Sequence, residues 1–308
     1  MTNSVPPPSG VYVPAVLFFD ENEELDIPPI KSHVLRLAQG GVTGILVQGS
    51  NGEAQHLSHD ERKETIRVTR QTLDENGFSQ VVIIAGTGGQ STRETKKLCK
   101  DAAEAGAAFC LVLTPGLWPP QMTPERILQF HREVADASPI PTMVYNFPVV
   151  TAGLNLDSDI IGALAQHPNI VGTKLSCGMI GKLQRLTSSV PASKFATFPG
   201  VSDVFLPGLV CGSAGLIGAL PNIAPKAHTE LYRLYKAGKL EEAQKIQALL
   251  SNADWELGKL GSIGGIKAMV AKHFGYGNTL VRGPLASADV QNTSIGKLEE
   301  LIAFEKSL

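Results

Sequence analysis

Two residues of the chain, Lys174 and Tyr145, have the types and surroundings that carbonyl chemistry requires. Lys174 ends the apolar run 171–174, and a lysine at the end of a buried strand is partly desolvated, which favours the neutral, nucleophilic amine. Tyr145 ends an earlier apolar run, and its phenol could move protons beside that amine. The pair predicts Schiff-base chemistry on a carbonyl substrate. Taken singly, each residue is also typical of a surface lysine past a strand end or of a half-buried tyrosine.

A glycine-rich loop would bind the carboxylate of such a substrate. It reads GSNGE from Gly49 to Glu53, and Gly49 lets the backbone approach a ligand while Ser50 and Asn51 offer hydroxyl and amide groups. An ordinary turn is the alternative, and the missing Lys-Ser/Thr pair argues against nucleotide binding. Near the end of the last predicted strand a ligand could also meet the backbone at Ile217, although close packing explains the glycines there as well.

Short apolar runs that alternate with longer amphipathic stretches must position these residues. The predicted strands cover residues 11–19, 44–48, 81–85, 109–113, 142–145, 170–174, 195–198 and 215–217. The predicted helices cover residues 28–39, 59–73, 92–105, 124–137, 157–165, 181–189 and 202–211. Strands that alternate with helices pair in parallel, and eight such units close into a (β/α)8 barrel of the α/β class with its site at the carboxyl ends of the strands. An open doubly wound sheet is the runner-up.

The alternation ends after residue 220. Helical patterns then cover 224–237, 240–257 and 264–274, and a last short helix is predicted over 294–304. We therefore expect a barrel that carries the catalytic site over residues 1–220 and a helical region packed on it over residues 221–308.

Composition excludes several classes of protein. The formal net charge of −2 gives no basic surface for a nucleic acid, and no apolar run reaches the roughly 18 residues that a membrane helix needs. Residues 1–10 lack the features of a secretory or transit peptide, so a cytoplasmic protein is expected. The four cysteines are expected to be buried thiols, and the seven histidines show no metal-ligand spacing.

In their order and spacing, GSNGE, YNFP, GTKLS and the GLIG of the last strand resemble the dihydrodipicolinate synthase / N-acetylneuraminate lyase superfamily over essentially the whole chain. The resemblance implies that Lys174 forms the imine with pyruvate and that Tyr145 is the proton shuttle. It also implies that Ser50 and Asn51, after Gly49, bind the pyruvate carboxylate and that the carbonyl of Ile217 faces the substrate. A cytosolic homotetramer, a dimer of dimers without metal or organic cofactor, is implied as well.

Departures from the superfamily pattern narrow the expected substrate. Dihydrodipicolinate synthases have a Thr-Thr pair where this chain has Ser50 and Asn51, and they carry an Arg after the YNxP motif where it has Val149-Val150-Thr151. A cation is the natural partner of their second substrate carboxylate, so that substrate is not favoured. The tyrosine that those enzymes place after a Thr-Pro pair is missing too, and a water or Ser176 would replace it.

The whole pattern is most similar to fungal 2-keto-3-deoxy-sugar-acid aldolases. This resemblance predicts cleavage of L-threo-3-deoxy-hexulosonate, a product of galacturonate breakdown, to pyruvate and L-glyceraldehyde. The alternatives are a 4-hydroxy-2-oxoglutarate aldolase, whose distal carboxylate needs a cation that none of these motifs supplies, and a keto-acid sensor without turnover, which an intact Lys174 and Tyr145 disfavour.

Overall fold

The computed structural model describes residues 4–288, 290 and 293–308, and in it eight parallel strands form a barrel. The strands are β1 (Gly10–Pro14), β2 (Gly44–Val47), β3 (Val82–Gly86), β4 (Phe109–Leu113), β5 (Thr142–Asn146), β6 (Ile170–Leu175), β7 (Ala196–Pro199) and β8 (Gly215–Ile217). Their order is β7-β6-β5-β4-β3-β2-β1-β8. The two edges meet where the Ala214 N–H donates to the Thr197 carbonyl over 2.9 Å. The predicted (β/α)8 fold is confirmed.

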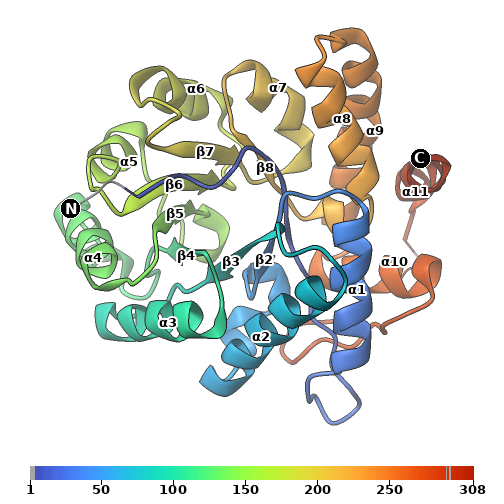
Figure 1. The fold of residues 1–308 in the computed structure, drawn as a ribbon, viewed down its shortest axis with the longest axis horizontal. Coiled ribbons are helices and arrows are strands. Elements are labelled where there is room, and N and C mark those ends of the chain that lie inside the picture. Colours follow the sequence, from blue (N-terminus) through green and yellow to red (C-terminus); the bar gives the residue numbers. More distant parts are fainter. Residues whose placement is uncertain (1–3, 289, 291–292) are drawn as a thin grey trace.

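Helices surround the barrel, as Figure 1 shows in a view along its axis. The ring consists of α1 (Ile27–Gln39), α2 (His59–Glu75), α3 (Thr92–Ala105), α4 (Pro124–Ala137), α5 (Ser158–Leu164), α6 (Ile180–Ser189), α7 (Phe205–Val210) and α8 (Pro225–Lys236). Local sequence fixes their starts; at α2, for example, Ser58 and Glu61 form a reciprocal capping box. None of the helices in the described ranges is both long enough and apolar enough to cross a bilayer.

Two apolar layers hold the barrel together. Buried side chains inside it include Tyr12, Leu46, Leu111 and Phe198, while a larger cluster lies between the strands and the helices. A barrel of this size is filled by side chains, which leaves room for a ligand only at the strand ends.

Three more helices follow the ring: α9 (Leu240–Lys259), α10 (Ile263–Phe274) and α11 (Gly296–Ser307). Their buried residues Leu250, Met269 and Leu301 belong to the same apolar cluster as Leu37 of α1. In Figure 1, α10 lies beside α1, on the side of α1 away from α2. The helical appendage is therefore packed on the barrel, and the boundary between residues 220 and 221 stays a proposal.

Two local predictions are wrong. The first strand ends at Pro14 rather than at residue 19, because the chain leaves the sheet and the Val16 N–H donates to the Asn222 side chain over 3.1 Å. A glycine directly after a helix is predicted to be left-handed, which after α1 would be Gly40; instead Gly40 has φ −72° and Gly41 is the left-handed residue (φ 78°).

Candidate active site

Strands β5 and β6 bring the predicted lysine and tyrosine together. Tyr145 and Lys174 are paired residues in the register of these strands, and Lys174 Nζ lies 4.4 Å from the centroid of the Tyr145 ring. The Lys174 side chain is only 3% exposed. Among the described residues no carboxylate and no hydrogen-bond acceptor pairs with its amine, so burial is not offset by a fixed counter-charge.

Aromatic and polar neighbours hold the tyrosine in place. Its ring stacks on Phe147 with centroids 5.6 Å apart, and Asn146 anchors the loop that follows β5. The Asn146 side chain accepts a hydrogen bond from the Leu156 N–H over 2.9 Å and donates to Asn155 over 3.1 Å. Lys182 of α6 also bonds to Asn155, and burial lowers the pKa of this second lysine. The segments that follow β5 and β6 are thus tied together next to the Tyr145–Lys174 pair.

The glycine-rich loop forms a tight turn directly after β2. The segment Ser50–Gly52 is a 3-10 turn, and the Gly52 N–H donates to the Gly49 carbonyl over 3.0 Å. The Nδ2 of Asn51 is buried and has no hydrogen-bond partner among the described residues. A buried amide without a partner is costly, and an acceptor group of a ligand would satisfy it.

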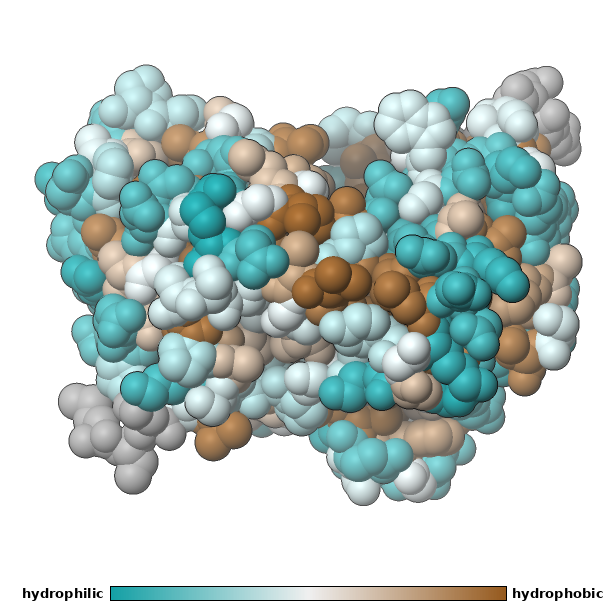
Figure 2. Space-filling model, turned by 90° about the horizontal axis from the view of Figure 1, so that it is seen from above, coloured by the Kyte–Doolittle hydropathy of each residue, from teal (hydrophilic) through white to brown (hydrophobic). Residues whose placement is uncertain are grey.

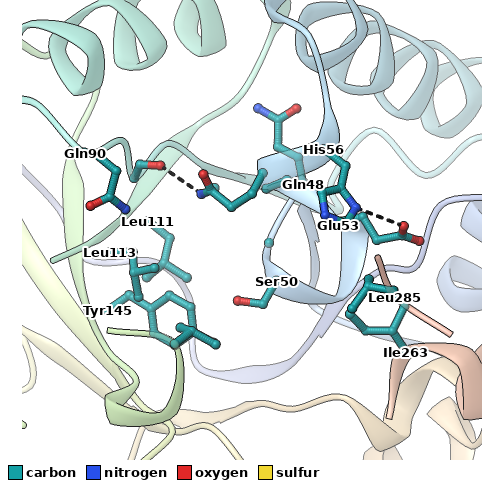
Figure 3. A pocket seen from close by; sticks show the side chains of 16 residues that line it. Gln48, Ser50, Glu53, His56, Gln90, Leu111, Leu113, Tyr145, Ile263 and Leu285 are labelled. Atoms are coloured by element: carbon teal, nitrogen blue, oxygen red, sulfur yellow. Dashed lines mark hydrogen bonds and ion pairs between the residues drawn. The ribbon is translucent and has the colours of Figure 1, made fainter. Parts of the chain in front are cut away.

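A cavity of about 280 Å³ opens beside this loop at the carboxyl ends of β2 to β5. Its walls carry polar and apolar side chains from both the barrel and the appendage, as Figure 3 shows. The lining residues are Gln48, Gly49, Ser50, Glu53, Ala54, Gln55, His56, Gly86, Gly88, Gln90, Leu111, Leu113, Tyr145, Val150, Ile263 and Leu285. Among the described residues, no Lys and no Arg lines the cavity.

The predicted site residues do not all meet at this cavity. Tyr145, Gly49 and Ser50 line it, and Tyr145 connects it to the amine of Lys174. Lys174 itself is not among the residues that line the cavity, and neither are Asn51, Ser176 and Ile217. Ser176 lies at the end of β6, where its N–H donates to the Asn146 carbonyl over 2.9 Å. Ile217 is fully buried on β8.

A buried ion pair behind the loop was not predicted from the sequence. Glu53 Oε1 lies 2.5 Å from Lys267 Nζ of α10, and both side chains are completely buried. Lys267 also donates to the Leu280 carbonyl over 2.7 Å and lies over the Phe19 ring, and the Arg282 N–H donates to Glu53 over 2.9 Å. The only hint in the sequence was a lysine within the apolar stretch 263–270.

This ion pair fixes a strained backbone. Glu53 has φ 52°, in the left-handed region that non-glycine residues seldom occupy, and it joins two short 3-10 turns. Such a conformation persists only where the surroundings hold it, and Lys267 and Arg282 of the C-terminal region supply that hold. The appendage therefore shapes the loop next to the cavity.

Metal chemistry has no visible site. No group of three or more His, Cys, Asp or Glu side chains within residues 4–288, 290 and 293–308 is arranged to hold an ion. Of the cysteines, Cys99 and Cys110 are buried, whereas Cys177 and Cys211 are half-buried, which corrects the expectation that all are buried.

Comparisons with known proteins agree with this geometry. The model of the Dihydrodipicolinate synthetase family matches residues 7–302. A relative from Emericella nidulans named "Probable 4-hydroxy-2-oxoglutarate aldolase, mitochondrial" is 45% identical over 97% of this chain and 96% of its own. The L-threo-3-deoxy-hexylosonate aldolase of Aspergillus niger is 40% identical, again over 97% of this chain and 96% of its own. Among solved structures, YagE of E. coli K12, a member of the dihydrodipicolinic acid synthase family in complex with pyruvate, has a TM-score of 0.85 at 26% identity and covers 97% of this chain and 98% of that one.

Proposed function

The chain belongs to the dihydrodipicolinate synthetase family and is an aldolase, and we propose that it works through a Schiff base between Lys174 and a 2-keto-3-deoxy sugar acid. The observation that carries the proposal is the buried amine of Lys174, which lies against the Tyr145 ring and has no counter-charge among the described residues. An amine that no described residue bonds to is available to attack the ketone of a keto acid.

The proposed cleavage starts with attack of Lys174 Nζ on C2 of the substrate. Loss of water from the carbinolamine gives a cationic imine, and Tyr145 takes the proton of the C4 hydroxyl. The C3–C4 bond then breaks, its electron pair moves into the imine to form an enamine, and the aldehyde leaves. Protonation of C3 and addition of water release pyruvate and the free lysine. Ser176 would assist the proton transfer through a water.

The carboxylate of the substrate would be bound by Ser50 and Asn51, with Gly49 giving close access to the backbone and the Ile217 carbonyl facing the keto acid. The position of Ser50 in the cavity wall and the unpaired Nδ2 of Asn51 support this assignment. The solved relative that contains pyruvate supports the choice of keto acid.

Charge in the cavity favours a sugar acid over 4-hydroxy-2-oxoglutarate. The second carboxylate of the latter would meet no Lys or Arg among the lining residues, while the single carboxylate there, Glu53, is already paired with Lys267. L-threo-3-deoxy-hexulosonate, which yields L-glyceraldehyde and belongs to galacturonate degradation, is the substrate we propose. The second candidate is 4-hydroxy-2-oxoglutarate, the substrate in the name of the Emericella relative.

Trapping with borohydride tests the mechanism. Incubation with pyruvate and sodium borohydride should add one reduced pyruvate to the wild-type chain, located by mass spectrometry on the peptide that contains Lys174. Lys174→Ala should abolish the adduct, and Lys194→Ala, at an exposed lysine, should leave it unchanged. An adduct that survives in Lys174→Ala would reject this lysine. Pyruvate release from a panel of D- and L-configured 2-keto-3-deoxy acids and 4-hydroxy-2-oxoglutarate then identifies the substrate.

We also propose that the chain assembles as a homotetramer. Large apolar side chains are exposed in the loops after β4 and β5, with Trp118 at 62% and Val149 at 83% exposure. Figure 2 views the side that carries α6 and α7 at the top of Figure 1, and apolar residues gather near the middle of that face. Exposed apolar patches are typical of subunit contacts. Light scattering should give four times the monomer mass, and a monomer would contradict the assembly.

A cytoplasmic location stays a proposal. The Emericella relative carries "mitochondrial" in its name, so the two compartments are the outcomes to separate. Fractionation of cells that express the chain, with detection by an antibody, decides between them.

A further inference from the structure

His56 lies in the cavity wall contributed by the segment after β2, whereas Tyr145 comes from β5 (Figure 3). It belongs to the 3-10 turn Ala54–His56, and its side chain is 24% exposed. Its Nδ1 is buried and forms no hydrogen bond with any described residue, and it lies 3.6 Å from Glu53 Oε2. Neither the cleavage steps nor the carboxylate site proposed above uses this ring.

The surroundings fix His56 from two directions. Glu53 is held by the Lys267 amine and the Arg282 N–H, so its carboxylate has a fixed orientation toward the imidazole. Arg282 also donates from Nη1 to the backbone carbonyl of His56 over 2.7 Å. Groups held in this way can recognise a ligand because little ordering is needed when it binds.

The carboxylate of Glu53 also bears on the tautomer of the ring, because it faces Nδ1. At 3.6 Å the contact is longer than a hydrogen bond, but an acceptor facing Nδ1 still favours the tautomer protonated there. The other nitrogen, Nε2, then carries a lone pair and accepts a hydrogen bond. A hydroxyl group can donate to it, whereas a carboxylate cannot.

We propose that His56 is a specificity-determining residue that accepts a hydrogen bond from a hydroxyl group beyond C4, in the part of the substrate that leaves as the aldehyde. This role of His56 rests on the proposed function, and it explains how the site would discriminate between a sugar acid and 4-hydroxy-2-oxoglutarate. A hydroxylated sugar acid satisfies Nε2, while the distal carboxylate of 4-hydroxy-2-oxoglutarate would face a lone pair in a wall without Lys or Arg.

Substrates with and without distal hydroxyl groups test this inference. His56→Leu should lower kcat/KM for a six-carbon 2-keto-3-deoxy acid by about tenfold to a hundredfold, the size expected for one lost hydrogen bond to a substrate hydroxyl. For 4-hydroxy-2-oxobutyrate, which lacks those hydroxyl groups, kcat/KM should change less than about threefold. His56→Gln, whose amide oxygen can accept the same hydrogen bond, should recover part of the loss on the six-carbon acid.

A neighbouring histidine provides the matched control. His59, on α2, bonds to Glu94 over 2.5 Å and is not among the cavity-lining residues. His59→Leu should therefore leave the ratio of the two kcat/KM values unchanged. His56→Lys should raise activity on 4-hydroxy-2-oxoglutarate relative to the sugar acid, because a cation replaces the lone pair.

Pyruvate trapping separates the two proposals. Failure of trapping in the wild-type chain would remove the proposed function. Normal trapping in His56→Leu together with the same loss on both substrates, or with no loss on either, would overturn only the role of His56. An equal loss would mean that the ring merely supports the loop.

Discussion

Lys174 and Lys267 are both buried and both lie over an aromatic ring, yet their surroundings differ in one respect. Their Nζ atoms lie 4.4 Å from the centroid of Tyr145 and 4.6 Å from that of Phe19, respectively. Lys267 is bonded to the Glu53 carboxylate, whereas Lys174 has no such partner among the described residues. Burial alone therefore does not distinguish the two lysines. The ammonium of Lys267 is bonded to a carboxylate, whereas no described residue bonds to the Nζ of Lys174, which leaves it available to a ligand.

Exchanging each lysine for methionine tests the contrast most strongly. Lys174→Met should lower kcat by about a thousandfold or more, because the covalent route is lost. Its melting temperature should stay near that of the wild type, since an apolar side chain of similar length replaces an unpaired polar group. A steady-state assay with a thermal melt measures both, and a large loss of stability at normal activity would reverse the assigned roles.

Tyr145→Phe should separate proton transfer from imine formation. It should lower kcat by about a hundredfold to ten-thousandfold, the usual size for general acid–base catalysis, while the borohydride adduct on Lys174 still forms. The stacked Phe147 contact is kept, so stability should change little. Equal turnover in Tyr145→Phe and wild type would exclude the phenol as the proton shuttle.

Lys267→Met should lower the stability of the chain, in contrast to Lys174→Met, which should lower its activity. It leaves the Glu53 carboxylate buried without its partner, and breaking a buried ion pair costs about 3–5 kcal/mol of unfolding free energy. Urea unfolding measures this loss. The double variant Glu53→Gln/Lys267→Met removes the stranded charge and should recover part of the stability. A Lys267→Met chain as stable as the wild type would show that the pair does not hold the loop.

Three buried histidines show what burial does to a base that stays neutral in the folded chain. Burial lowers the pKa of His33 and His131 to about 3 and that of His228 to about 4. Because these values lie below the ordinary value of 6.5, the stability they contribute is complete above pH 6.5 and is lost as the pH falls toward 4 and 3. The unfolding free energy should drop by about 2 kcal/mol per histidine between pH 7 and pH 5. In His228→Gln the unfolding free energy should drop less over this pH range than in the wild type. The same pH dependence in the variant and the wild type would contradict this expectation.

Local patterns predicted much of the fold because they act over short distances. Apolar runs and the amphipathic stretches between them located the strands and most of the helices. The end of β1 was missed because Asn222, far along the chain, takes the Val16 N–H out of the sheet. Of the candidate site, the Tyr145–Lys174 pair followed from two neighbouring strand ends, whereas Gln48, Gln90, Ile263 and Leu285 enter the cavity wall from segments that no motif connects.

The sequence by itself determined that an amine and a phenol stand at the ends of adjacent parallel strands, because strand order and register follow from local alternation and barrel geometry. Only the tertiary structure decided which buried lysine has a counter-charge. Glu53 and Lys267 are 214 positions apart, and no local pattern predicts such a contact. That long-range contact pairs Lys267, holds Glu53 in its strained backbone and presents His56 to the cavity.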